Sequence, residues 1–183
     1  MVRLLLCSTW LVAGVTNGFA QGPITTEDVQ RIIKKYADIW NNDPKNVPLW
    51  VVGAEPGDGV AIPGVTFSTK DNPKAGMNIP VHAHLIVLNK KMVPENLLST
   101  FFHEYGHARY LVTHQLHEDE VGSEREAIRF SLEALTNEGY INLAYREAEN
   151  VKEMAKEEPY KSAVARLVND PLWNKYGRVS VSK

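Results

Sequence analysis

Cysteine is nearly absent from this chain. The one cysteine, Cys7, lies in an N-terminal segment that we expect to be removed, so the chain from Gln21 onward contains none. Without cysteine, residues 21–183 cannot form a disulfide, supply a cysteine nucleophile or bind a metal through thiolate. Any metal that this part of the chain binds must therefore be held by histidine and carboxylate side chains.

A strong excess of charge of either sign is also missing. The 20 lysine and arginine residues nearly balance the 22 aspartate and glutamate residues, which gives a formal net charge of −2 at pH 7. This balance provides no electrostatic reason to expect nucleic acid or an anionic membrane as a partner. No internal repeat or low-complexity tract occurs, and the length of 183 residues suits one domain.

The first 20 residues have the layout of a secretory signal peptide. Arg3 supplies a positive charge, an uncharged and largely apolar run follows to Val15, and Gly18 and Ala20 place small residues at positions −3 and −1 before Gln21. The apolar run is shorter than the roughly 20 residues that span a membrane, although an N-terminal anchor or a buried helix is the alternative. We expect residues 21–183 to form one domain that is secreted or periplasmic and has no stable membrane association.

Apolar periodicity predicts an α+β domain, in the order helix, small sheet and further helices. Thr25 or Thr26 caps the first helix, which ends near Asn41 to Pro44. Strands are expected at 49–52, at 60–67 with an interruption at Pro63-Gly64, and at 81–88. Later helices are expected at 94–112, from Ser123 as the cap with Glu126 completing a capping box, at 140–157 and at 160–168, with 171–183 irregular.

The sequence His103-Glu104-Tyr105-Gly106-His107 is an H-E-x-x-H motif on the helix expected at 94–112. Two imidazoles four residues apart lie on one face of a helix and can bind the same cation. The adjacent Glu104 then lies beside the open side of the metal, where it can act as general base toward a water molecule. This arrangement is typical of zinc-dependent peptidases.

The third metal ligand has two kinds of candidate. A three-histidine site would need glycine at 110 and histidine at 113, where the chain has Tyr110 and Thr113, and His114 lies roughly 10 Å further along a continuing helix. A glutamate from the following helix is the other kind. Glu124 shares its helix face with apolar residues, and Glu126 shares its face with mostly polar ones. We therefore favour Glu124, with Glu126 as the second choice.

Three segments of the chain resemble the gluzincin clan of zinc metallopeptidases, in particular its compact minigluzincin-like members. They are the strand ending Ile86-Val87-Leu88-Asn89, the helix 101–108 and the helix start Ser123-Glu124-Arg125-Glu126-Ala127-Ile128. In such families the first glutamate of Glu-x-Glu-Ala binds zinc, which supports Glu124, whereas a thermolysin-like alignment would favour Glu126. Ile128 stands where a polar residue often hydrogen-bonds a zinc-bound histidine, so that support is in doubt here.

The resemblance implies a zincin-like fold, with a small, mostly antiparallel sheet packed on the active-site helix and further helices toward the C-terminus. It implies Zn²⁺ bound by His103, His107 and Glu124, with Glu104 as the catalytic base. In zincins the strand before this helix is the edge strand that pairs with an extended peptide, so the expected substrate-binding residues are His84, Leu85 and Ile86, with Tyr140. The candidates for an oxyanion donor are Tyr140, His114, His117 and Tyr145.

The function expected from these residues is a secreted zinc-dependent peptidase that cleaves a peptide or protein substrate with a metal-activated water. The alternative is a binding module on the same scaffold without catalysis. The intact Glu104 argues against that alternative, since a purely structural metal site needs no base and normally has four protein ligands. His82 and His84 alternate on the expected strand, so a second metal site is conceivable there, although histidines that line a groove are the simpler reading.

Overall fold

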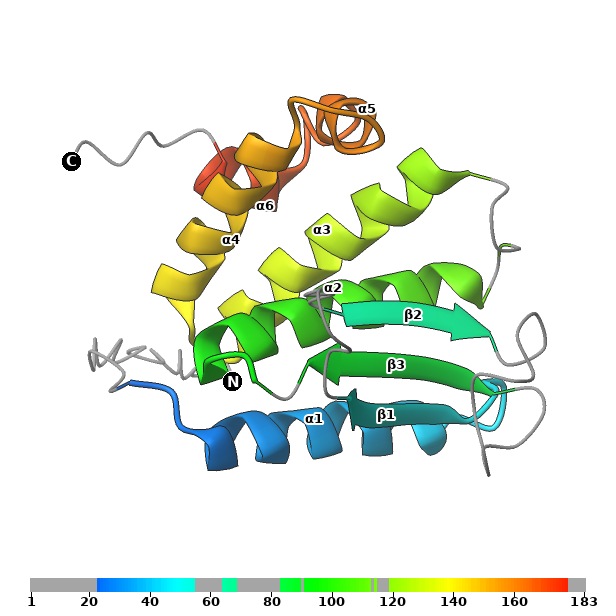
Figure 1. Ribbon diagram of the computed structural model, residues 1–183. Helices are drawn as coiled ribbons and strands as arrows, with labels where there is room; N and C mark the ends of the chain where they lie inside the picture. Colours follow the sequence, from blue (N-terminus) through cyan, green and yellow to red (C-terminus); the bar gives the residue numbers. More distant parts are fainter. Residues whose placement is uncertain are drawn as a thin grey trace, which may run out of the picture.

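The computed structural model describes residues 23–54, 64–68, 83–89, 91–112, 114 and 119–177. The expected signal peptide, His82, His117 and the first part of the strand expected at 60–67 lie outside these residues. The described elements follow the chain as α1 (Thr26–Asn41), β1 (Leu49–Ala54), β2 (Gly64–Ser68), β3 (His84–Asn89), α2 (Pro94–Leu111), α3 (Glu120–Asn137), α4 (Ile141–Met154), α5 (Tyr160–Ala165) and α6 (Pro171–Tyr176). Helices and strands are therefore mixed, as the sequence predicted (Figure 1).

The described strands form one three-stranded sheet in the order β1-β3-β2. β1 pairs with β3 in parallel, with Leu49 opposite His84, and β2 pairs with β3 antiparallel, with Ser68 opposite His84. The expectation of a mostly antiparallel sheet is thus wrong for the described strands, because one of their two pairings is parallel. The expectation that β3 is an edge strand is also wrong, because both of its sides are paired.

The central place of β3 agrees with its side chains. His84, Leu85, Ile86 and Leu88 are buried, and Val87 and Asn89 are partly buried. A near-continuous apolar run of this kind is typical of a strand covered on both faces.

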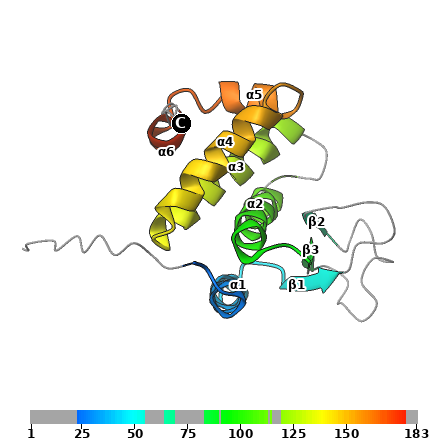
Figure 2. The ribbon, with the colours of Figure 1, turned by 60° about the vertical axis from the view of Figure 1, so that its left-hand side comes forward.

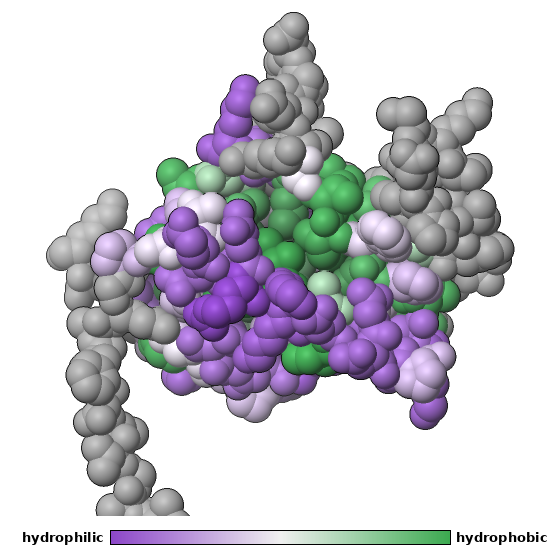
Figure 3. All heavy atoms as spheres, turned by 90° about the horizontal axis from the view of Figure 1, so that it is seen from below, coloured by the Kyte–Doolittle hydropathy of each residue, from purple (hydrophilic) through white to green (hydrophobic). Residues whose placement is uncertain are grey.

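Helix α1 is an amphipathic helix that packs against α2 and β1. The Thr25 hydroxyl accepts a hydrogen bond from the Asp28 backbone N–H at 3.1 Å, and Asp28 completes the capping box. A cap of this kind contributes about 1 kcal/mol to helix stability. Val29, Ile32 and Trp40 are buried on the inner face. Figure 3 shows the molecule from below the view of Figure 1, the side on which α1 lies. Hydrophilic side chains cover much of this face, and apolar side chains gather beside them.

Helix α2 lies in the middle of the molecule, between the sheet and the pair α3 and α4 (Figure 2). Its first turn begins with Pro94, as the sequence predicted. Large apolar residues on several sides of this helix are buried, among them Leu98, Phe101, Phe102 and Tyr105. Helix α3 packs along α2, and α4, α5 and α6 in turn contact α3. Helix α2 is therefore packed on two sides, against the sheet and against the other helices.

Two helix boundaries differ from the expectation. Helix α3 begins at Glu120 with Asp119 as its cap, whose side chain accepts from the Gly122 N–H at 2.9 Å, so Ser123 is not the cap. The segment expected to be irregular contains α6, because Asp170 caps it and Trp173 and Tyr176 are buried. Across the described residues, no helix combines the length and the apolar character needed to cross a membrane.

Candidate metal centre

His103 and His107 lie one turn apart on the same face of α2, as the motif spacing requires. Their Nε2 atoms are 3.2 Å apart. The two rings meet nearly edge to face, with centroids separated by 4.8 Å and an angle of 83° between their planes. The two imidazole nitrogens therefore point toward one region of space beside α2.

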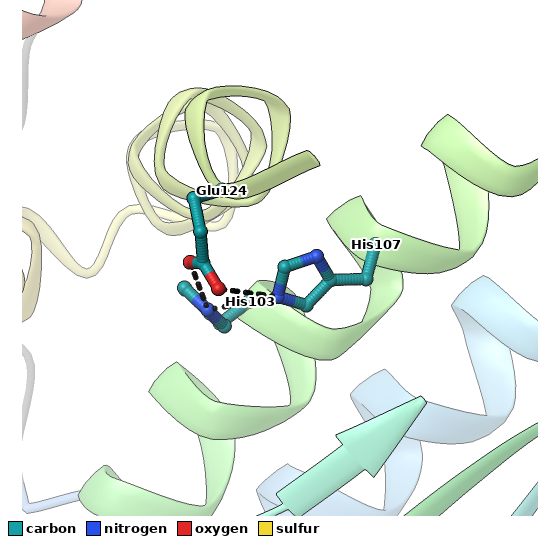
Figure 4. Close-up of side chains that lie close together, drawn as sticks. All are labelled: His103, His107 and Glu124. Atoms are coloured by element: carbon teal, nitrogen blue, oxygen red, sulfur yellow. Dashed lines mark hydrogen bonds and ion pairs between the residues drawn. The ribbon is translucent and has the colours of Figure 1, made fainter. Parts of the chain in front are cut away.

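Helix α3 brings Glu124 to the same region (Figure 4). Glu124 Oε2 lies 3.3 Å from His103 Nε2, and Oε1 lies 3.6 Å from His107 Nε2. Glu126 lies on another face of α3, where it pairs with Arg109 at 3.5 Å and with Arg129 at 3.9 Å. Of the two glutamates considered from the sequence, the structure thus places Glu124 against the histidines.

The three groups are close enough together to hold one metal ion. A zinc ion with bonds of about 2.1 Å to each ligand holds neighbouring ligand atoms about 3.4 Å apart. The two histidine nitrogens, 3.2 Å apart, are close to that value, and with one ligand atom taken from each residue the three atoms lie within 4.8 Å of one another. Glu124 Oε2 is also buried and has no hydrogen-bond partner in the described part of the chain. A bound cation would satisfy this oxygen, so His103, His107 and Glu124 can hold a metal.

Ser123 fixes the ring of the second histidine. His107 Nδ1 lies 2.8 Å from Ser123 Oγ, on the side of the ring away from Glu124. When Nδ1–H donates to this hydroxyl, the lone pair of Nε2 is left to face a cation. Ser123 immediately precedes Glu124, so the first turn of α3 supplies both a candidate ligand and a group that orients another one. Sequence reasoning interpreted Ser123 only as a helix cap and missed this role.

Tyr160, at the start of α5, is a further residue of the site that sequence reasoning missed. Its hydroxyl and the Glu124 carboxylate lie close enough to shift each other's pKa. Its ring stacks beside His103, with centroids 6.4 Å apart and an angle of 26° between the planes. Burial and the nearby carboxylates raise the pKa of Tyr160 well above its usual value, so the hydroxyl keeps its proton and acts only as a donor.

Burial and nearby charges shift the pKa of each of the three candidate ligands. Burial would lower the pKa of His103, but the contact with Glu124 and the charges of Glu104, Glu124 and Glu147 together raise it to about 9. Burial and the charge of His103 lower the pKa of His107 to about 4. Burial would raise the pKa of Glu124, but the two histidines and Tyr160 hold it below its usual value. Without metal, the side chains of His103, His107 and Glu124 therefore hold one proton at neutral pH, mainly on His103.

Glu104 lies between the two histidines in sequence and is 7% exposed. Its negative charge contributes to the raised pKa values of both His103 and Tyr160. A carboxylate in this position, beside a metal site with three ligands, can accept a proton from a water molecule bound there.

The residues expected to bind substrate do not gather at this centre. His84, Leu85 and Ile86 are 5%, 1% and 0% exposed, and the main chain of β3 is already paired on both sides. Tyr140 lies beyond the far end of α3, which is about 20 Å along the helix from Glu124, and charges that act on it come from Asp28 and Arg31 of α1. The structure therefore does not support a substrate-binding role for these four residues. The three on β3 are buried in a strand that is paired on both sides, and Tyr140 is separated from the site by the length of α3.

Two of the other candidates for an oxyanion donor, Tyr145 and His114, pack against aromatic rings away from the three candidate ligands. Tyr145 packs edge to face against Tyr176, with centroids 4.9 Å apart. His114 stacks on Tyr110, with centroids 3.9 Å apart, beyond the C-terminal end of α2. His117 lies outside the described residues. The ring of His84, which was considered for a second metal site, packs edge to face against Trp40.

Comparisons of the chain with protein-family models, with curated proteins and with solved structures found no match.

Proposed function

We propose that this protein is a zinc-dependent peptidase with a zincin-like fold, of the gluzincin kind. The observation that carries the proposal is the convergence of His103, His107 and Glu124, whose ligand atoms lie within 4.8 Å of one another. Glu104 on the same turn of α2 supplies the base that such a site needs for hydrolysis. The resemblance of residues 101–108 and 123–128 to gluzincins supports the same assignment.

The donor set favours zinc over other common cations. Two imidazole nitrogens and one carboxylate oxygen form a mixed set that suits Zn²⁺, whereas Ca²⁺ and Mg²⁺ prefer oxygen ligands alone. Three protein ligands leave one position for water, which is the arrangement of catalytic rather than structural zinc sites. This open position, together with Glu104, favours a catalyst over a binding module on the same scaffold.

Each residue of the site has a chemical role in this proposal. His103, His107 and Glu124 would hold the zinc, which would lower the pKa of a water molecule toward 7 and polarise the carbonyl group of the scissile peptide bond. The Glu104 carboxylate accepts the proton that the attacking water loses, and it then passes this proton to the nitrogen of the leaving amine. Tyr160, whose ring lies beside His103, would donate its hydroxyl proton in a hydrogen bond to the negative charge that develops on the carbonyl oxygen.

The substrate is an extended peptide segment that lies along the sheet. β3 cannot receive it, because both sides of this strand are paired. β2 is an outer strand in the part of the sheet that is described, and it packs against α2. A peptide that pairs with the main chain of β2 would therefore run beside the helix that carries His103 and His107.

Purified protein tests this proposal through metal content and cleavage. Residues 21–183 should contain one zinc per chain and cleave casein or a quenched fluorescent peptide. A chelator should abolish the cleavage, and added zinc should restore it. Zinc without cleavage of any peptide would favour the binding module. Expression of the full chain with its own first 20 residues tests the secreted location, since the mature protein should start at Gln21.

A further inference from the structure

Strand β1 lies at one end of the described sheet, so only one of its two sides is paired with another described strand. The His84 N–H donates to the Pro48 carbonyl at 2.8 Å, so the even-numbered residues of this segment direct their main-chain groups toward β3. Because this direction alternates along a strand, Leu49, Val51 and Gly53 direct their main-chain groups away from the sheet. These groups form the outer edge of β1.

The side chain of Asn41, the last residue of α1, occupies the first position of this outer edge. Its Nδ2 group donates to the Leu49 carbonyl at 3.1 Å, and its Oδ1 atom accepts from the Leu49 N–H at 2.8 Å. A residue of a neighbouring strand would make the same two bonds. No hydrogen bond between described residues reaches the outward main-chain groups of Val51 or Gly53. The outer edge can therefore receive another strand at these two residues.

The side chains of β1 do not protect the outer edge from pairing with another chain. Natural edge strands usually carry lysine, proline or a bulge for that purpose. β1 has the sequence LWVVGA, without charge or proline, and its register with β3 runs without a bulge. Trp50 is 42% exposed, and Val47, just before the strand, is 39% exposed. Figure 3 shows apolar side chains gathered on the side where α1 and β1 lie. An exposed tryptophan beside an unprotected edge is typical of a surface that another chain covers.

The substrate of the proposed enzyme is not the partner that fits this edge. Helix α2, which carries His103 and His107, contacts β2 and β3 but, among the described strands, not β1. β1 packs instead on α1. A peptide on the outer edge of β1 would therefore lie away from the candidate metal ligands.

We propose that two copies of this chain associate through the outer edge of β1, as an antiparallel strand pair about a two-fold axis at Val52. Asn41 determines this register, because within β1 it leaves Val51 and Gly53 to form the new bonds. Val51 of each copy then exchanges both main-chain hydrogen bonds with Gly53 of the other, and Val52 lies opposite its own copy. Because β1 carries no charge, the pairing brings no like charges opposite each other. The association does not depend on the proposed zinc site.

Analytical ultracentrifugation of the full chain tests the association. We expect the mass of two chains at high concentration and of one chain after dilution. Val51→Pro removes an outward N–H but no bond to β3, so it should raise the dimer dissociation constant at least about 10-fold. Trp50→Lys should do the same, because it adds like charges at the interface. Met154→Lys is the matched control and should leave the constant unchanged, because Met154 is 40% exposed at the end of α4, a helix that contacts none of the described strands.

A disulfide measures the register. The full chain with Cys7→Ser contains no cysteine, so Val52→Cys adds a single one. Residues opposite each other in a non-hydrogen-bonded antiparallel pair have Cα atoms about 4.5 Å apart, a distance that a disulfide bridges. Val52→Cys should therefore give a disulfide-linked dimer on mild oxidation, whereas Met154→Cys in the same background should stay mostly unlinked. Equal linking of the two variants would overturn the register.

Three results would overturn the proposal. A monomer at every concentration would leave the edge to a segment of another protein. A dimer that Val51→Pro and Trp50→Lys do not weaken would place the interface elsewhere. Hydrogen exchange of the Val51 and Gly53 amides should be slow in the dimer and fast after dilution, and slow exchange in the monomer would show that one chain covers its own edge. Zinc content of the same samples tests the proposed function separately.

Discussion

Gly106 lies so close to α3 that a Cβ atom at this position would be 2.5 Å from the Cα of Ala127 and 3.1 Å from the carbonyl oxygen of Glu126. This contact is between two helix backbones, so no flexible side chain can move aside. It occurs inside the H-E-x-x-H motif and three residues after Glu124. Because glycine has no Cβ atom, α3 can approach α2 closely at this point, and this approach allows Glu124 to contact the two histidines.

The first prediction follows from this contact. Gly106→Ala should push α3 away from α2, lower the free energy of unfolding by about 1–3 kcal/mol, and weaken zinc binding. Gly139→Ala is the control, because Gly139 has a φ of 85° at the far end of α3 and alanine there should cost about 1–2 kcal/mol of stability. If both variants lost stability but kept parental zinc affinity, the account of Gly106 would be wrong.

The second prediction separates the two glutamates of α3. Glu124→Ala should abolish stoichiometric zinc binding, since it removes the third candidate ligand. Glu126→Ala should keep the zinc and lose at most about 1 kcal/mol of stability, because its ion pairs with Arg109 and Arg129 are partly exposed. Metal analysis after dialysis measures both. Zinc retained by Glu124→Ala and lost by Glu126→Ala would reverse the assignment.

The third prediction concerns pH. The pKa of His103 in the metal-free protein is raised to about 9, so zinc must displace a proton from this ring below that pH. Zinc affinity should therefore fall about tenfold for each pH unit from 9 to 7, with release of close to one proton per zinc in calorimetry at pH 7 in buffers of different ionisation enthalpy. Affinity that did not change over this range would contradict the raised pKa.

The raised pKa of His103 also makes the stability of the metal-free protein depend on pH. Because the folded-state pKa of His103 lies above the ordinary histidine value of 6.5, its protonation stabilises the metal-free fold. This contribution is fully present below about pH 6.5 and is lost as the pH rises through 9. Urea unfolding of the chelator-treated protein measures it. The lowered pKa of His107 acts in the opposite direction below pH 6.5, where the unfolded chain binds a proton that the fold resists.

The fourth prediction concerns Tyr160. Tyr160→Phe should lower kcat about 100-fold and leave zinc binding nearly unchanged, since the phenol is not one of the three candidate ligands. Tyr145→Phe and Tyr140→Phe are matched controls that should keep kcat, because both side chains lie in contacts away from the centre. A parental kcat in Tyr160→Phe would remove Tyr160 from the catalytic machinery.

The sequence predicted the parts of the site that depend on one helix or on one helix face. The spacing of His103 and His107 places both rings on one side of α2, whatever surrounds the helix. The apolar neighbours of Glu124 on α3 indicated that this residue points inward, and the structure has it there. The cap at Thr25 and the proline at the first helical position, Pro94, also depend only on local sequence, and both helices begin where these residues predicted.

The parts that the sequence did not predict depend on contacts between distant segments. The apolar run of β3 was consistent with a strand but did not indicate its order in the sheet, which is set by pairing with β1 and β2. Asp119 and Ser123 are both good helix caps, and only the structure shows which one accepts the backbone hydrogen bond. Tyr160 lies 36 residues after Glu124 and reaches it only because α5 folds back onto α3.

The central claim is that Glu104 acts as the base beside a zinc ion held by His103, His107 and Glu124. The most direct measurement compares zinc content and peptide cleavage in the parent and in Glu104→Gln, which has the same shape without a basic carboxylate. The account predicts one zinc per chain in both proteins, and cleavage by the parent that the variant loses by a factor of at least about 100. Equal cleavage by the two zinc-loaded proteins would contradict it.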